Sequence, residues 1–496
     1  MGRKIPMWQV AIVMIVTIGL LCYALNIFHM LFYNGQDTSP LYCGYGELHV
    51  PLIFAATLAA IIAIINGYKW KFLENGIIAS ISRSMQACLI LLVVGMLIGS
   101  WIASGVVPAM IYYGLMILSP GVFLVASCLI CCIVSLASGS SWTTAGTIGI
   151  ALVGVGFGLG INPAMTAGAI VSGAYFGDKM SPLSDTTNMA PAVAGSTLFE
   201  HIRHMIWTVT PSLIIALVIY AILGLGNASR DVDMSAVKEL QDALIGSFNI
   251  NPALLIPPLL VIVMVALKTP ALPGLIGGTV LGVIMGMIFQ GIAVGDIFGL
   301  LHYGYESVTG NADIDNLLTR GGMDSMLWTV NLIICAMTIG GVMDSSGMLA
   351  QLAEAMLKLA RNVGSLVTVT IVSCLFMNVI ASDQYLAIIL PGRMYREAFE
   401  DMRLKNKNLS RCLEDSGTMT SPLVPWNTCG ATMSTFLGVP TVQYIPYAFL
   451  NLLNPIVSIF YGFTGISMEK MTEAEYKVVL ANRKADKAAA LKALEA

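Results

Sequence analysis

The stretch that decides the fold is residues 173–188, which read GAYFGDKMSPLSDTTN. It lies inside an otherwise apolar run that is long enough to cross a membrane, yet it contains a proline, several hydroxyl side chains and two carboxylates. Pro182 removes a backbone donor and the hydroxyls compete for backbone hydrogen bonds, so we expect the helix to open here. The exposed carbonyl oxygens, together with Asp178 and Asp185, would suit a hard cation such as sodium.

The composition around this stretch excludes most soluble classes of protein. Of the 496 residues, 57% are hydrophobic and 11% are charged, against about 25% charged in soluble domains. The net charge of −3 provides no field that would attract a polyanion. We therefore expect neither a soluble enzyme, nor a disordered chain, nor a nucleic-acid binder. The cysteines inside apolar runs lack metal-ligand spacing and are predicted to be core residues.

Apolar runs of about 20 residues predict membrane-spanning helices. Two runs, near 163–200 and 412–440, are interrupted by polar, Gly and Pro residues. The eight uninterrupted candidates lie near 7–32, 49–66, 85–104, 205–224, 252–268, 272–290, 326–344 and 444–463. With the N-terminus in the cytoplasm, alternation puts all Lys and Arg on the inside except Lys179, Arg230, Lys238 and Arg320. We therefore expect a multi-pass protein of the cytoplasmic membrane with both termini in the cytoplasm.

Two further apolar stretches, near 120–158 and 363–392, do not fit a count of simple crossings. Basic residues flank the second stretch on both sides, so both of its ends should be cytoplasmic. About 30 residues cannot cross twice, since each crossing needs about 20. The second stretch is therefore predicted to be a re-entrant hairpin with residues 381–384 at its tip.

Short matches between the two halves of the chain predict an internal repeat. Offsets of 240–244 residues relate Ser84-Met85 to Ser325-Met326, Ala137-Ser138 to Ala381-Ser382, and Ser181-Pro182-Leu183 to Ser421-Pro422-Leu423. The repeat maps the second hairpin onto 120–158, with its tip at 138–144, and five crossings separate equivalent elements. The halves should therefore point in opposite directions. We expect a first repeat over 1–225, an extracytoplasmic linker over 226–251, a second repeat over 252–466 and a charged cytoplasmic tail over 467–496.

The carboxylates of the interrupted segments are the candidates for ion binding. A carboxylate at the bilayer centre costs about 2.5–3.5 kcal/mol even on the insertion scale, so a functional role is the default expectation. Burial disfavours the charged form, which lets a proton compete with sodium for the same oxygens. We expect Asp178 and Asp185 to bind sodium and protons in turn, with Asp383 contributing from the second half. The other residues predicted to line the sodium site are Ser181, Thr186, Thr187, Asn188, Asn427 and Thr428.

Each carboxylate also has a structural interpretation. Asp178 could pair with Lys179 or cap a helix, and Asp185 could be the N-cap of the next half-helix. Asp383 could be the cap of a hairpin helix without any role in ion binding. Lys179 could instead snorkel to the surface. His201 and His204 are predicted to anchor the chain at the cytoplasmic interface rather than to sense protons.

Residues 172–188, followed by EHIRHM at 200–205 and by Trp207, closely resemble the NhaC family of sodium/proton antiporters. The similarity extends to residues 135–142 and 421–428. It implies a sodium-linked, proton-driven antiporter of the inner membrane, within a larger group of two-hairpin ion transporters.

The same family includes members that resemble malate/lactate exchangers coupled to sodium and protons. A carboxylate substrate would use half-helix N-termini and the hydroxyl donors of the two tips. No arginine is expected in the cavity for bidentate recognition, which favours cations alone.

The sequence thus predicts an all-α polytopic membrane protein with about ten transmembrane helices and two re-entrant hairpins, in an inverted repeat with broken helices. Such an arrangement is typical of secondary transporters. We expect exchange of internal sodium for external protons, no bound cofactor, and no enzyme activity, because no nucleophile or metal cluster is apparent. The expected partners are sodium ions, protons and the lipid bilayer, with a small carboxylate as the alternative substrate. A homodimer is left open.

Overall fold

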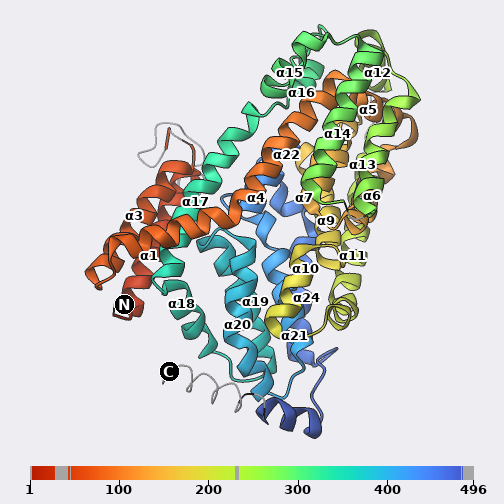
Figure 1. Ribbon diagram of the computed structural model, residues 1–496. Helices are drawn as coiled ribbons and strands as arrows, with labels where there is room; N and C mark the ends of the chain where they lie inside the picture. Colours follow the sequence, from red (N-terminus) through yellow and green to blue (C-terminus); the bar gives the residue numbers. More distant parts are fainter. Residues whose placement is uncertain are drawn as a thin grey trace.

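The computed structural model describes residues 3–27, 43–44, 46–228, 234–267, 269–481 and 483. These residues form helices joined by short loops (Figure 1). Within them, eight helices are long and apolar enough to cross a membrane, or up to ten if each of two bent pairs is one span. The predicted all-helical membrane protein is confirmed at this level.

The helices of the first half begin with a pair near the N-terminus and end with a long helix before the linker. Their bounds are α1 Met7–Ala24, α3 His49–Ile65, α4 Trp70–Ala103, α5 Val106–Ile117, α6 Pro120–Ser138, α7 Ser141–Thr144, α8 Ile150–Gly158, α9 Pro163–Met180, α10 Asp185–Ala194 and α11 Leu198–Ala228. A π-helical turn, η1 at Ala145–Gly149, joins α7 to α8 without a break, so residues 141–158 form one helical arm.

The second half contains more short helices. Their bounds are α12 Met234–Ser247, α13 Ile256–Ala266, α14 Ala271–Met285, α15 Ile297–Tyr303, α16 Ala312–Leu318, α17 Leu327–Ser345, α18 Met348–Leu357, α19 Val363–Ile380, α20 Gln384–Asp401, α21 Asn406–Leu413, α22 Thr428–Leu437, α23 Thr441–Tyr444 and α24 Phe449–Thr464. Between α21 and α22 lie the π-helical turn η6, Glu414–Thr418, and the 3-10 turn η7, Ser421–Leu423.

Five of the eight uninterrupted spans predicted from sequence overlap helices that are long and apolar enough to cross a membrane. The span at 49–66 corresponds to a shorter apolar helix, α3, and those at 252–268 and 444–463 belong to the two bent pairs. The described residues do not include 28–32 of the first predicted span. Of the predicted tail beyond residue 481, they include residue 483 alone. The predicted linker over 226–251 contains a helix, α12. It forms because Val237, Leu240 and Leu244 recur at helical spacing and are buried against the neighbouring helices.

The order of elements from α4 to α11 recurs from α17 to α24. Each series runs through a long helix, a short helix, a two-armed hairpin, an interrupted helix and a closing helix. In Figure 1, α5 lies in the upper part of the view and α18 in the lower half, so the two short helices occupy different ends of the molecule.

The helix breaks predicted at the two Ser-Pro-Leu sequences are confirmed. The first separates α9 from α10 over residues 181–184, and the second separates η6 from α22 over residues 419–427. Pro182 and Pro422 lie inside these breaks, where a proline cannot donate a helical hydrogen bond.

The predicted end of the second hairpin at residue 392 was wrong. Its second arm, α20, continues to Asp401, because Tyr395 and Phe399 keep an apolar stripe buried beyond the first arginines. The arms therefore have 18 residues each, about 27 Å at 1.5 Å per residue. Two arms of this length are not excluded from crossing the membrane, so re-entry stays a prediction.

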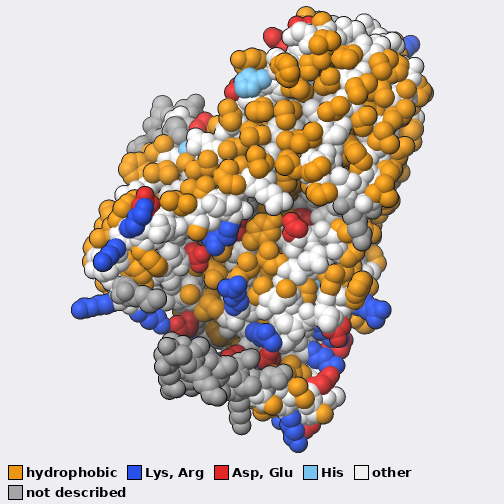
Figure 2. Space-filling model, in the orientation of Figure 1, with side chains coloured by type: hydrophobic (Ala, Val, Ile, Leu, Met, Phe, Trp, Pro, Cys, Tyr) orange, Lys and Arg blue, Asp and Glu red, His pale blue; other side chains and the backbone are white. Residues whose placement is uncertain are grey.

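The distribution of charge differs between the two ends of the molecule. Figure 2 shows hydrophobic side chains over the upper part of this face, around α12 to α14, and most of the visible Lys and Arg in the lower part. Lys4 pairs with Glu354 of α18 at 2.9 Å, and Arg403 pairs with Glu473 at 2.8 Å. The two described ends of the chain thus lie on the same side.

Candidate functional site

A cavity of about 960 Å³ lies where the four helix interruptions meet. Figure 2 shows acidic and basic side chains around the hollow between α4 and α10 on this face. The lining combines both hairpin tips, both breaks and one face of α4, and its polar members include Arg83, Gln86, Ser138, Ser140, Asp178, Ser184, Asp185, Thr186, Asn188, Asp383, Gln384, Tyr385 and Thr428.

Four helix N-termini border this cavity, and each begins for a local reason. Ser140 caps α7 by accepting a hydrogen bond from the amide of Thr143 at 3.2 Å. Asp383 caps α20 through the amide of Leu386 at 2.8 Å, and Asn427 caps α22 through the amide of Cys429 at 3.0 Å. The fourth helix, α10, starts after the extended Ser184. The positive ends of four half-helices therefore point at one space.

Asp178 is the buried carboxylate of the first break. It accepts a hydrogen bond from Ser141 at the first hairpin tip and another from Ser184 at 3.1 Å. Its backbone carbonyl accepts from Thr187 at 2.6 Å and from Thr186 at 3.3 Å. These contacts hold the end of α9 against the hairpin and the next half-helix. Among the described residues, no Lys or Arg forms an ion pair with Asp178.

The other two predicted carboxylates lie elsewhere around the same cavity. Asp185 is exposed, in the first turn of α10. Asp383 is buried and caps α20, as its structural interpretation required, while its side chain still borders the cavity. One space thus brings together Asp178, Asp185 and Asp383 from both halves of the chain.

The predicted neutral ligands divide into two groups. Thr186, Asn188 and Thr428 line the cavity. The remaining three lie outside its lining and support the breaks: Ser181 accepts from the amide of Leu183 at 3.3 Å, Thr187 donates to backbone carbonyls, and Asn427 donates to Asn378 at 3.1 Å.

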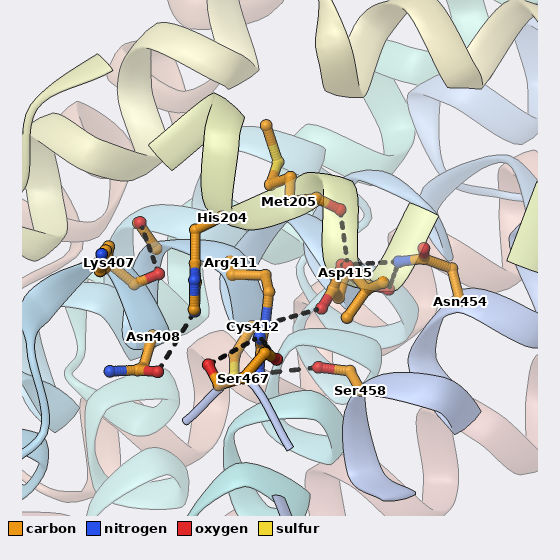
Figure 3. A network of polar contacts seen from close by, with 12 residues as sticks. His204, Met205, Lys407, Asn408, Arg411, Cys412, Asp415, Asn454, Ser458 and Ser467 are labelled. Atoms are coloured by element: carbon orange, nitrogen blue, oxygen red, sulfur yellow. Dashed lines mark hydrogen bonds and ion pairs between the residues drawn. The ribbon is translucent and has the colours of Figure 1, made fainter. Parts of the chain in front are cut away.

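Lys179 does not pair with Asp178 and does not snorkel to the surface. It is fully buried and forms an ion pair with Asp415 in η6. Figure 3 shows Asp415 between Arg411, whose Nε lies 3.6 Å from the carboxylate, and Asn454, which donates a 2.7 Å hydrogen bond. Sequence reasoning missed this network, although the four-residue spacing of Arg411 and Asp415 inside an apolar segment is a usable signal.

The two histidines pack against α21 inside the molecule. His201 Nδ1 lies 2.8 Å from Ser410 Oγ. His204 Nε2 lies 3.2 Å from Asn408 Oδ1, as Figure 3 shows. Both side chains are buried between helices, and the anchoring role at the interface stays a prediction.

The expectation of an arginine-free cavity was wrong. Arg83 lines the cavity and pairs with Asp344 of α17 at 3.2 Å. The predicted span began at residue 85, but α4 begins at Trp70, which places Arg83 well inside the helix. The apolar window used to find the span excluded the charged first turns that belong to the same helix.

The chemistry of the site is that of oxygen ligands. In the part of the chain that the structure describes, no group of three or more His, Cys, Asp or Glu side chains could hold a metal ion. A cation here would be bound by one carboxylate with hydroxyl and carbonyl oxygens, a set that suits hard ions.

Interrupted helices whose N-termini converge on a cavity with buried carboxylates define the class of secondary transporters. Residues 173–466 match the model of the Na+/H+ antiporter family. The chain belongs to this family, and it is a transporter rather than an enzyme.

Three relatives show the range of the family. The chain is 40% identical to the Na+/H+ antiporter NhaC of Alkalihalophilus pseudofirmus, over 86% of this chain and 92% of that protein. It is 37% identical to the arginine/ornithine antiporter ArcD of Halobacterium salinarum, over 85% and 88% of the two chains. It is 36% identical to the malate-2H+/Na+-lactate antiporter of Bacillus subtilis, over 84% and 89%.

Proposed function

We propose that this protein exchanges internal sodium ions for external protons across the cytoplasmic membrane, with both termini in the cytoplasm. The observation that carries the proposal is Asp178, a buried carboxylate that borders the cavity and has two hydroxyl donors but no Lys or Arg counter-ion among the described residues. Such a group is stable only when a bound cation or a proton neutralises it.

Sodium and a proton would then use the same carboxylate in turn. The Ser141 and Ser184 hydroxyls stabilise the ionised form that binds sodium. Ser141 belongs to the first hairpin tip and Ser184 precedes α10. Whether Asp178 holds a sodium ion or a proton therefore changes the hydrogen bonds that join these two elements. In a protein whose two halves run in opposite directions around one site, the sodium-bound and protonated states would favour conformations open to opposite sides of the membrane.

Asp185 and Asp383 are proposed to have supporting roles. Asp185 is exposed at the start of α10 and adds negative charge where a cation enters. Asp383 contributes the carboxylate of the second half. Thr186, Asn188 and Thr428 add neutral oxygens to the same space.

The test is sodium-dependent proton flux in proteoliposomes, followed with an internal pH indicator. Asp178→Asn is expected to abolish the flux while the protein remains monodisperse. Asp296→Asn is the matched control, because Asp296 is an exposed aspartate that does not line the cavity. Full exchange by Asp178→Asn would remove Asp178 from the mechanism.

A second candidate function is exchange of a small carboxylate coupled to sodium and protons. The cavity volume far exceeds that of one ion, and four helix N-termini supply positive charge to its wall. Arg83, although paired with Asp344, also lines the cavity and carries the hydrogen-bond donors for a carboxylate. The names of two relatives specify malate with lactate, and arginine with ornithine. Uptake of labelled malate or lactate in the same proteoliposomes decides between the candidates, and Arg83→Gln should lower that uptake.

A further inference from the structure

A second set of buried oxygens lies outside the cavity lining, in the π-helical turn η6. Glu414 is fully buried, and neither of its carboxylate oxygens accepts a hydrogen bond of ordinary geometry, although the hydroxyls of Thr418 and Thr186 face it. The hydroxyl oxygen of Thr418, in the same turn, is also buried and without a partner. Buried polar atoms in folded proteins are almost always paired, so two orphaned side chains in one turn indicate a missing ligand.

The neighbouring charges do not supply that ligand. Lys179 and Arg411 both bind Asp415 rather than Glu414. Among the described residues, no Lys or Arg forms an ion pair with Glu414. An ionised carboxylate buried without a partner costs several kcal/mol, so it must bind a positive species.

The groups that face Glu414 come from several elements. Thr418 belongs to its own turn, Thr186 to α10, and Asp178 and Lys179 to α9. Cys374 faces it from α19. The nearby part of α20 contributes Ala387 and Ile388, which pack on Gly417. One carboxylate and two hydroxyls are thus the oxygens available, and hard cations prefer such ligands.

We propose that Glu414, Thr418 and Thr186 form a second sodium site, separate from the one at Asp178. This inference rests on the proposed function. Thr186 connects the two sites, because it lines the cavity and its hydroxyl lies 3.1 Å from that of Ser184, which donates to Asp178. The protein therefore binds two sodium ions per chain, one in the cavity and one behind it.

The experiment is equilibrium binding of radioactive sodium to the purified full-length protein in detergent. The wild type is expected to bind two ions per chain, and Glu414→Gln and Asp178→Asn are each expected to bind one. Thr418→Val should still bind two ions, with affinity at one site weakened about tenfold, as for the loss of about 1.4 kcal/mol. Thr370→Val is the matched control, because this buried hydroxyl only donates to Leu366 within α19.

The outcomes separate this proposal from the proposed function. A wild type that binds one ion, with none bound by Asp178→Asn, overturns the second site and leaves the exchange at Asp178 intact. Two ions bound by a folded Glu414→Gln protein also overturn it. No sodium bound by the wild type refutes both proposals. If Glu414→Gln is not monodisperse, Asp178→Asn decides alone, because one remaining ion supports the second site and none refutes it.

Discussion

The buried charge network around Asp415 allows a quantitative stability prediction. Asp415 and Lys179 have fully buried side chains, and the pair joins the end of α9 to η6. Asp415→Asn keeps the shape of the residue and an oxygen that can accept from Thr208 and Asn454. It removes only the negative charge, so Lys179 and Arg411 lose their shared counter-ion.

The magnitude follows from the distances. At 3.6 Å and an effective dielectric constant of about 20, the attraction between Arg411 and Asp415 is about 5 kcal/mol. Measured losses on breaking buried pairs are about 3–5 kcal/mol. We therefore expect Asp415→Asn to lower the free energy of unfolding by about 3–5 kcal/mol, measured by chemical denaturation in detergent micelles.

A double-mutant cycle tests the cause. Lys179→Met removes one of the orphaned cations, so the double variant should lose about 2–3 kcal/mol less than the sum of the single variants. The exposed pair of Lys4 and Glu354, 2.9 Å apart, is the control, and Lys4→Met should change stability by at most about 1 kcal/mol. Strict additivity, or an Asp415→Asn protein as stable as the wild type, would refute the reasoning.

Three other variants have defined expected results. Ser184→Ala should lower the apparent sodium affinity about 10- to 100-fold in flux assays, because Asp178 loses one hydrogen bond to its charged form and the proton competes better. Asp185→Asn should raise the apparent KM for sodium less at high salt than at low salt, because its exposed charge is screened; an effect independent of salt would place Asp185 in direct contact with the ion. Gly430→Ala should prevent recovery of a monodisperse protein, because its Cβ would lie 2.0 Å from the Val424 carbonyl, whereas Gly19→Ala, with open space around it, should behave as wild type.

The parts of the fold that sequence reasoning predicted are those fixed by local chemistry. Pro182 and Pro422 lie in the predicted breaks, where neither can donate a helical hydrogen bond, whereas Pro191 and Pro391 are accommodated inside continuous helices. The apolar runs predicted the helices because a segment inside a membrane must form its backbone hydrogen bonds within itself. The short matches between the halves predicted a repeat, and the element order of α4 to α11 recurs from α17 to α24.

The parts that were missed depend on contacts between distant segments. Nothing near Glu414 in the sequence distinguishes its orphaned carboxylate from the paired Asp415 beside it. The partner of Lys179, Asp415, is 236 positions away in the sequence. The alternative that Lys179 pairs with the adjacent Asp178 was therefore wrong. Arg83 was excluded by a hydropathy window, although the helix continues through it.

The arrangement of half-helices explains how one cavity can hold three carboxylates. Each helix N-terminus carries about half a positive charge, so the four that border the cavity contribute about +2. Asp178, Asp185 and Asp383 contribute −3 when ionised, while Arg83 and Asp344 cancel. The remainder is about −1, which a single sodium ion or a single proton neutralises. Two such ions together would leave the cavity positive, so occupancy by one disfavours the other. A carboxylate substrate would add −1 and would require a second cation in the cavity.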